Sequence, residues 1–109
     1  MTARFQVRRD GIEAAVAAVR EFVAYVAANE PGTFRYESLQ EKDDPTRFLH
    51  VFVFRDAEAR RIHSSSPGVE RFTNVLYPLC VPSDGGAPVS DAGVRFTEFA
   101  LIATTESQP

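Results

Sequence analysis

The segment from Arg47 to Phe54 constrains the fold most, because it has the alternation of a β-strand and yet offers neither side to water. Its two sides are Phe48, His50, Phe52 and Phe54, and Leu49, Val51 and Val53. A strand with one solvated face alternates apolar with polar residues, so we expect both faces of this one to be covered. One layer of helices covers only one face of a sheet, and the other face therefore needs a second cover.

Three further segments are expected to be strands. Residues 3–7 alternate apolar and polar side chains, and Thr33 to Gln40 does the same, with Phe34, Tyr36 and Ser38 predicted on one side. The charged turn at 41–45 joins the latter to Arg47–Phe54, which predicts a hairpin. The last strand is predicted from Val94 to Ala103.

Helical periodicity fills the intervals between the strands. Asp10 and Glu13 have the spacing of a capping box, and Pro31 ends the first helix near Asn29 or Glu30. Asp56 is expected to cap a short helix through about His63, and Ser66-Pro67 to open the next. The predicted buried stripes are Ile12, Val16, Val19, Val23 and Val26, and then Val69, Phe72, Leu76 and Leu79.

This order of elements is typical of an α+β, ferredoxin-like split β-α-β sandwich, in which an antiparallel four-stranded sheet carries its helices on one face. We expect one domain over residues 1–109, with its core at about 3–103, a flexible loop at about 82–93 and a polar tail at 104–109. The bare apolar sheet face predicts a homodimer, with two sheets packed face to face in a shared barrel-like core.

Composition excludes several classes of function. The net charge of -3 gives no positive field for nucleic acid, and no apolar run reaches membrane-spanning length. The first five residues lack the apolar stretch of a secretion signal, and the lone Cys80 suits a reducing compartment, so we expect a cytoplasmic protein. The only two histidines lie on different elements, and no phosphate-binding glycine motif occurs, so we expect no metal and no cofactor.

Several motifs then resemble the antibiotic biosynthesis monooxygenase (ABM) domain. They are Asn29-Glu30-Pro31-Gly32-Thr33 with Tyr36, Asp44-Pro45-Thr46-Arg47-Phe48, Phe54-Arg55-Asp56, and His63 with Ser66, Val69 and Phe72. The resemblance covers about residues 3–103 and implies a ferredoxin-like protomer of a dimeric α+β barrel. It also implies a pocket between sheet and helices, which in characterised members holds a polycyclic phenol, a quinol or haem. Members that act on phenols and quinols oxygenate them without metal or flavin.

The chain departs from that family in strand 47–54. Many members carry Glu and then Trp or Tyr where this chain has Phe52 and Phe54, which predicts a more apolar cavity. The haem-degrading branch uses a catalytic Trp and an iron-binding helical His. This chain has no Trp, and His63 lies about where that branch has its Trp, so haem degradation is disfavoured.

His63 is the candidate catalytic residue. Imidazole titrates near neutral pH, which suits proton abstraction from a phenol or enol, and the resemblance places a histidine at this position. An alternative stays open, in which His63 only caps its helix by donating to the last free carbonyls.

The candidate substrate-binding residues are polar groups and aromatic walls: Tyr36, His50, Tyr77, Arg47, Asn74, Phe52, Phe54 and Phe72. Each also has a structural interpretation. The two tyrosines and His50 can be core residues, Arg47 can pair with the carboxylates of the hairpin, and Asn74 can be exposed.

Together these residues favour a cofactor-independent monooxygenase acting on a planar aromatic or quinol-type molecule. Two alternatives use the same scaffold, namely a non-catalytic small-molecule-binding or stress-response module and a purely structural dimer. Because a fold alone does not transfer activity, the site has to decide among them.

Overall fold

The computed structural model describes residues 1–81 and 93–105. In chain order, its elements are β1 (Thr2–Val7), η1 (Arg9–Gly11), α1 (Ile12–Asn29), β2 (Thr33–Gln40), β3 (Arg47–Phe54), α2 (Ala57–Ser64), α3 (Pro67–Leu76), η2 (Tyr77–Leu79), β4 (Cys80–Val81) and β5 (Arg95–Thr97). The predicted hairpin of β2 and β3 and the predicted end of α1 are confirmed.

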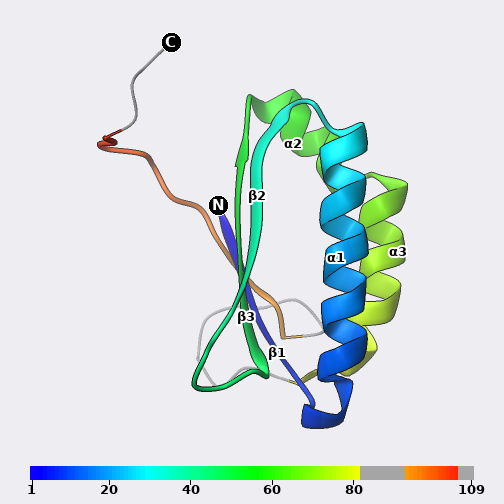
Figure 1. Cartoon of the computed structure of the whole chain (residues 1–109). Coiled ribbons are helices and arrows are strands. Elements are labelled where there is room, and N and C mark those ends of the chain that lie inside the picture. Colours follow the sequence, from blue (N-terminus) through cyan, green and yellow to red (C-terminus); the bar gives the residue numbers. More distant parts are fainter. Residues whose placement is uncertain (82–92, 106–109) are drawn as a thin grey trace.

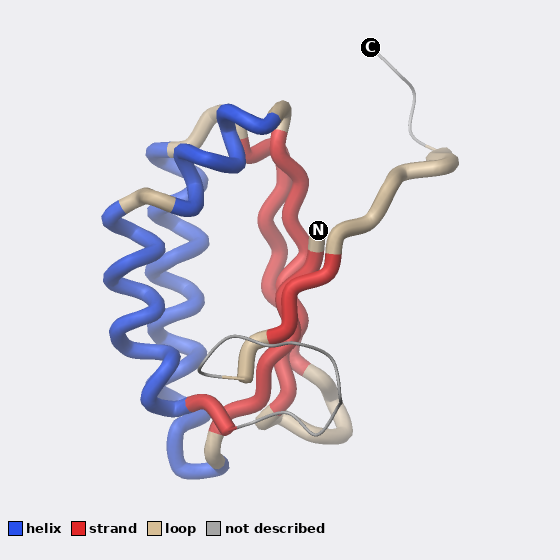
Figure 2. The backbone as a smooth tube through the Cα atoms, turned by 180° about the vertical axis from the view of Figure 1, so that it is seen from behind, coloured by secondary structure: helices blue, strands red, loops and turns tan. Residues whose placement is uncertain are grey.

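The strands form one antiparallel sheet in the order β2-β3-β1-β4, with β5 also paired to β1. All helices of the described residues lie on one face of this sheet, as both views of the backbone show (Figure 1 and Figure 2). The two central strands, β1 and β3, pair over five residues. The predicted α+β, ferredoxin-like arrangement is therefore confirmed.

The last strand differs from its prediction over Val94 to Ala103. It is shortened to β5, which pairs with β1 only as far as Thr97, and a separate two-residue strand that was not predicted, β4, lies opposite the end of β1 and makes a fifth strand of the sheet. Thr97 lies opposite Thr2, the first residue of β1, so that strand offers no further partner. The chain beyond Thr97 leaves the sheet as an extended arm, residues 98–105, that projects from the body (Figure 1).

The predicted capping box at the start of α1 is wrong. Asp10 lies in the short turn η1, where the Arg8 side chain donates to its carboxylate at 3.1 Å, and the residue that precedes α1 is Gly11. A β-carbon on Gly11 would lie 3.1 Å from Leu79 Cδ2, so close packing against η2 favours glycine there. The predicted caps of the later helices are confirmed, because Asp56 accepts from the amide of Ala59 and Ser66 from that of Val69.

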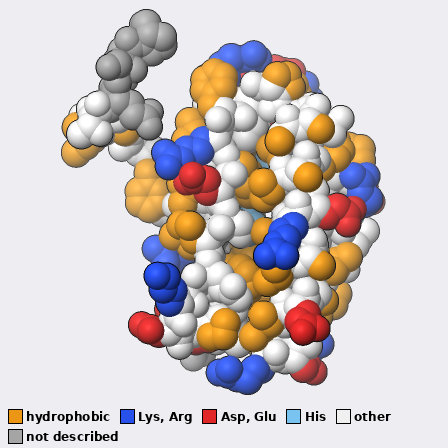
Figure 3. Space-filling model, in the orientation of Figure 1, with side chains coloured by type: hydrophobic (Ala, Val, Ile, Leu, Met, Phe, Trp, Pro, Cys, Tyr) orange, Lys and Arg blue, Asp and Glu red, His pale blue; other side chains and the backbone are white. Residues whose placement is uncertain are grey.

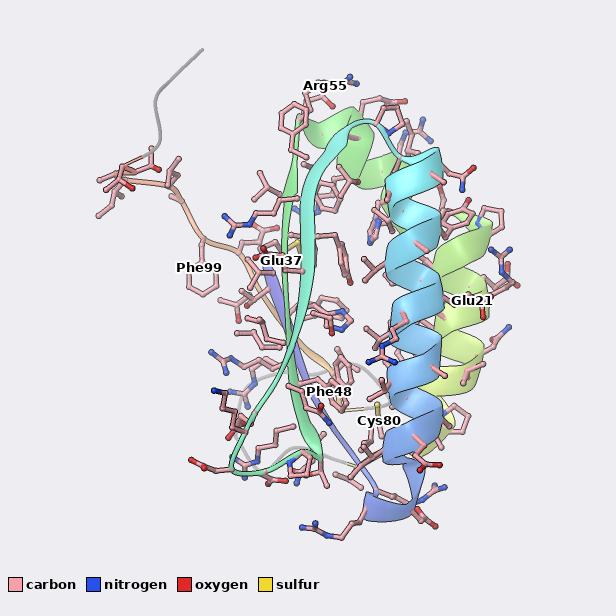
Figure 4. The ribbon with its side chains drawn as sticks, viewed as in Figure 1. Glu21, Glu37, Phe48, Arg55, Cys80 and Phe99 are labelled. Atoms are coloured by element: carbon pink, nitrogen blue, oxygen red, sulfur yellow. The ribbon has the colours of Figure 1, made fainter. Side chains whose placement is uncertain are left out.

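The core lies between the inner face of the sheet and α1 and α3. Its buried face on α1 is Ala15, Val19, Phe22 and Val26, so the stripe is rotated from the prediction, and Ile12, Val16 and Val23 only flank it. Phe48 lies between the sheet and α1 (Figure 4). Phe34 was predicted beside Tyr36 but is 65% exposed, because the pairing of β2 shifts register between Thr33 and Arg35.

The outer face of the sheet is mixed in character. Leu39, Leu49, Val51 and Val53 form an apolar centre that is exposed or half-buried, as the two-sided apolar pattern of β3 predicts. The exposed side chains of Arg4, Arg35 and Glu37 surround it on β1 and β2. The outer face is thus partly apolar and partly charged.

Two predicted segments fall mostly beyond what the structure describes. The expected flexible loop at about 82–93 lies outside the described residues except for Gly93, and so does most of the tail at 104–109. In the described part of the chain, no helix is long and apolar enough to cross a lipid bilayer.

Candidate active site

A cavity of about 470 Å³ opens between the inner face of the sheet and helices α2 and α3. This volume lies within the range of about 300–1,000 Å³ that is usual for small-molecule sites. The cavity is lined by both histidines and by a set of aromatic side chains, Phe5, Phe22, Tyr36, Phe52, Phe54, Phe72, Tyr77 and Phe96. Its walls therefore suit a flat, largely apolar molecule.

A second hollow, of about 670 Å³, runs along the seam between α1 and β2, where Figure 3 shows hydrophobic side chains. Tyr36 borders both spaces. The described residues that line the second hollow include no histidine. The cavity that holds His50 and His63 is therefore the better candidate for chemistry.

His63 is placed at the cavity by α2. Asp56 caps this helix, which carries His63 on its buried side, together with Ala59. The Nδ1 atom of His63 lies 2.7 Å from Oε1 of Glu30, and both side chains are buried. The ring is thus held by a carboxylate from another element and not by a helix carbonyl, as the capping alternative required.

Glu30 is held in turn at the end of α1. Its amide donates to the carbonyl of Val26, and its Oε1 accepts a hydrogen bond of 2.9 Å from the hydroxyl of Thr33. Gly32 lets α2 approach, because a β-carbon there would lie 2.6 Å from the β-carbon of Ala59. The turn between α1 and β2 therefore positions the carboxylate that holds His63.

The contact with Glu30 indicates which nitrogen of His63 carries the proton. An ionised carboxylate can only accept hydrogen bonds, so it favours the proton on Nδ1. The lone pair then lies on Nε2, and His63 lines the cavity. A histidine oriented in this way by a carboxylate can act as a general base, because the carboxylate stabilises the imidazolium that forms.

A second polar pair lies in the same cavity. The hydroxyl of Tyr36 is 2.8 Å from Nδ1 of His50, between neighbouring strands β2 and β3. Burial lowers the pKa of His50 to about 4, so its ring is neutral at pH 7. Burial, and to a smaller extent the charge of Glu30, raises the pKa of Tyr36 above its usual value. Both groups are therefore uncharged hydrogen-bonding groups at neutral pH.

Stacked aromatic rings surround these polar pairs. Phe22 and Phe72 stack at 4.5 Å between centroids, and Tyr36 and Phe52 at 5.0 Å, both nearly parallel. Phe54 lies 5.2 Å from the His63 ring. Flat walls of this kind offer stacking surface to a planar ligand and keep water away from the polar groups.

The structure brings most of the predicted site residues together. His63, Tyr36, His50, Tyr77, Phe52, Phe54 and Phe72 all line the cavity. Arg47 does not, because it pairs with Asp44 at 3.3 Å in the hairpin, as its structural interpretation held. Asn74 lies instead at a separate, smaller hollow of about 290 Å³ between α1 and α3.

Sequence reasoning missed Glu30 and Arg60. Glu30 appears in the Asn29-to-Thr33 motif, but a glutamate at a helix end is usually exposed, and its partner is 33 residues away. Arg60 lines the cavity and pairs with Glu98 on the arm. The sequence feature that came nearest to identifying Arg60 as a cavity residue is its position three residues before His63 on the same short helix.

Other chemistry finds less support. Burial raises the pKa of the Cys80 thiol to about 11, so little reactive thiolate is present at neutral pH. Among the residues that the structure describes, no group of three or more His, Cys, Asp or Glu is arranged to hold a metal ion.

Comparison with known proteins agrees with this geometry. The family model described as antibiotic biosynthesis monooxygenase matches residues 1–75. The match ends within α3, earlier than the expected 3–103. No curated protein sequence matches the chain.

Solved structures share the fold. A Nitrosomonas europaea protein that carries the name of the same family has a TM-score of 0.70 at 23% identity, over 75% of this chain and 78% of that chain. A Caulobacter crescentus protein with the same family name has a TM-score of 0.70 at 19% identity, over 86% and 81%. A Shewanella oneidensis protein reaches 0.65 at 27% identity, over 75% and 79%.

Proposed function

Because the chain belongs to the antibiotic biosynthesis monooxygenase family, we propose that it is a cofactor-independent monooxygenase that acts on a planar aromatic or quinol-type molecule. The observation that carries this proposal is the buried contact between Glu30 and His63 at an aromatic cavity of about 470 Å³. The contact supplies a base, and the cavity supplies flat walls from which water can be excluded.

In the proposed reaction, Nε2 of His63 takes a proton from an acidic C–H or O–H group and leaves a delocalised substrate anion. The anion transfers one electron to O2, and the two radicals combine into a peroxide. For a CH2 group of the anthrone type, loss of the second C–H proton breaks the O–O bond. For this step His63 first returns its proton to the peroxide and then takes the second C–H proton, and the hydroxide that leaves accepts that proton from His63, so that the products are a ketone and water.

The other polar groups at the cavity orient the substrate in this proposal. Tyr36, His50 and Tyr77 have hydrogen-bonding atoms, while Phe52 and Phe72 provide stacking surface. A dry site strengthens each polar contact with a developing negative charge. Arg47 and Asn74 have no part in it, because they lie away from the cavity.

One observation favours binding without turnover as a second candidate function. Phe52 and Phe54 occupy the strand positions where many family members carry Glu and an aromatic with a polar group, so the cavity has fewer polar atoms. A dimeric module that binds a small aromatic molecule needs only the cavity and its walls. The two functions differ in whether O2 is consumed.

Oxygen uptake with anthrone and with naphthalene-1,4-diol tests the proposal. With the wild-type protein, O2 should be consumed faster than by the same compound in buffer alone. His63→Ala should lower the rate of O2 uptake by about tenfold or more. Asn74→Ala is the matched control, because Asn74 lies outside the cavity, and it should leave the rate unchanged. Binding of either compound without O2 uptake would favour the binding module.

We propose further that two copies pair through the outer faces of their sheets. The apolar centre of that face contains Leu39 and Val53, both exposed in the single chain. On the arm, Phe99, Leu101 and Ile102 are 65%, 78% and 95% exposed, and Figure 4 shows Phe99 on the side of the sheet opposite α1. A second copy supplies a self-complementary cover for these groups. Sedimentation equilibrium at micromolar concentration should give twice the chain mass of 12.1 kDa.

We also propose the cytoplasm as the compartment. Cys80 is free and half-buried, and a small protein without disulfides suits a reducing environment. Cell fractionation with a tagged full-length chain tests this placement, and recovery outside the cytoplasm would contradict it.

A further inference from the structure

The Nε2 atom of His50 is buried and has no hydrogen-bond partner among the described residues. Of the ring nitrogens of the two histidines at the cavity, it is the one in this state. His50 is only 1% exposed and lines the cavity. A buried polar atom without a partner costs free energy, commonly about 1–3 kcal/mol. Such an atom at a ligand-sized cavity indicates a group that becomes paired when the cavity is filled.

Counting hydrogens decides whether this nitrogen donates or accepts. His50 is neutral at pH 7 and carries one N–H, and its Nδ1 faces the hydroxyl of Tyr36 at 2.8 Å. If Nδ1–H donated to Tyr36, the Tyr36 proton and the lone pair on Nε2 would both need other partners. If Tyr36 donates to Nδ1, only Nε2–H is left over, which is the arrangement with fewer unsatisfied groups.

We infer that Nε2–H of His50 is the hydrogen-bond donor of a carbonyl subsite, so that the bound molecule is a planar aromatic with a ketone or enolate oxygen directed at His50. Tyr36 is the positioning residue, because its hydroxyl fixes the proton of His50 on Nε2. The rings of Phe5 and Phe72 pack around His50, at 5.1 Å and 5.9 Å between centroids, and hold its plane. This inference rests on the proposed function and extends it, because it requires a substrate with an acceptor oxygen in addition to an acidic hydrogen.

The subsite complements His63 chemically. When a base removes a proton next to a conjugated carbonyl, negative charge moves onto the carbonyl oxygen. A donor that is already oriented toward that oxygen stabilises the anion more than the neutral ketone. His63 would then take the proton and His50 would hold the charge, with no change in the protonation state of His50.

Binding of 9-fluorenone compared with fluorene tests the inference without any turnover. The two molecules are planar and nearly equal in size, and only fluorenone has a carbonyl. The wild-type protein should bind fluorenone about tenfold more tightly, which is the effect of one good neutral hydrogen bond. With a ¹³C-labelled carbonyl, the infrared stretch in the complex should lie below its position in cyclohexane.

Variants separate the effect of the His50 hydrogen-bond donor on binding from that of the cavity walls. His50→Phe should remove the preference for fluorenone and return the carbonyl stretch toward the cyclohexane position, while fluorene still binds. Tyr36→Phe should reduce the preference partly, and it provides a second test if His50→Phe does not fold. Asn74→Ala is the matched control and should retain the preference, because Asn74 lies outside the cavity.

The outcomes separate the carbonyl subsite from the aromatic cavity. Equal binding of fluorenone and fluorene to the wild-type protein, or an unchanged preference in a folded His50→Phe, would overturn the carbonyl subsite alone. Failure of both compounds to bind would overturn the proposed aromatic cavity and the subsite with it.

Discussion

The carboxylate of Glu30 and the imidazole of His63 meet at 2.7 Å inside the protein, although 33 residues separate them in the chain. Glu30 comes from the end of α1 and His63 from α2, so the contact joins two helices where the turn from α1 into β2 begins. Both side chains are buried, and the same carboxylate oxygen also accepts from Thr33. The pair therefore contributes to the stability of the fold as well as to the proposed site.

A double-mutant cycle on this pair should reveal strong coupling. Glu30→Ala and His63→Ala should each destabilise the protein by about 3 kcal/mol, because each leaves a buried polar partner unpaired. The double variant should lose about 1–3 kcal/mol less than the sum of the single losses. Urea unfolding at pH 7 measures all three values, and additive single effects would show that the two groups do not interact.

Acid should destabilise the fold through His50. Its folded-state pKa is about 4, whereas a histidine in an unfolded chain has a pKa of about 6.5. Between these values the unfolded chain binds more protons, so the contribution is complete above about pH 6.5 and is lost as the pH falls toward 4. The full loss is about 3 kcal/mol, at about 1.4 kcal/mol for each pH unit.

The His50→Phe variant isolates this effect from the titration of carboxylates. Urea unfolding of both proteins at pH 7 and at pH 4 should show a drop in the wild-type protein that is larger by about 2–3 kcal/mol. Parallel losses in the two proteins would mean that His50 is not buried in its neutral form.

A methyl group on Gly32 should disturb the turn that supports Glu30. In Gly32→Ala, the new carbon would meet the β-carbon of Ala59 at 2.6 Å, and neither atom is the end of a flexible side chain. We expect a loss of about 1–3 kcal/mol. Gly11→Ala is the control, because its nearest contact is the flexible end of Leu79 at 3.1 Å, and it should cost less. Thermal unfolding of the two variants compares them, and equal losses would contradict the close approach of α2.

A charge on the outer sheet face should weaken the proposed dimer. Val53 on β3 and Ile62 on α2 are both 44% exposed, but only Val53 lies on the sheet. Val53→Glu should raise the dimer dissociation constant at least about tenfold, because the new carboxylate would be desolvated on pairing. Ile62→Glu should leave it unchanged. Sedimentation equilibrium measures the dimer dissociation constant of both variants. A similar rise of this constant in both would place the interface elsewhere.

Short-range patterns allowed much of the fold to be predicted. The bounds of β2 and β3 follow from alternation within eight residues, and the caps at Asp56 and Ser66 follow from a side chain and an amide three residues apart. The order of these elements then restricts the sheet to very few topologies. The resemblance placed His63 at the site, and the structure places it on the cavity.

Long-range pairing explains what could not be predicted. The partner of His63 lies at the end of another helix, and no local pattern distinguishes a buried Glu30 from a solvated one. The end of β5 at Thr97 depends on where β1 begins, while the apolar alternation of the chain continues past it. The exposure of Phe34 depends on a register shift in β2 that alternation alone does not encode.

Deuterium exchange into anthrone in D2O under anaerobic conditions tests most directly whether His63 removes a proton from a bound substrate. Without O2 the reaction stops at the substrate anion, so exchange at the CH2 group, followed by NMR, reports proton transfer alone. The wild-type protein should accelerate this exchange, and in His63→Ala, while it still binds anthrone, the exchange should be slower by about tenfold or more. Exchange at the wild-type rate in a folded His63→Ala that binds anthrone would show that His63 is not the base.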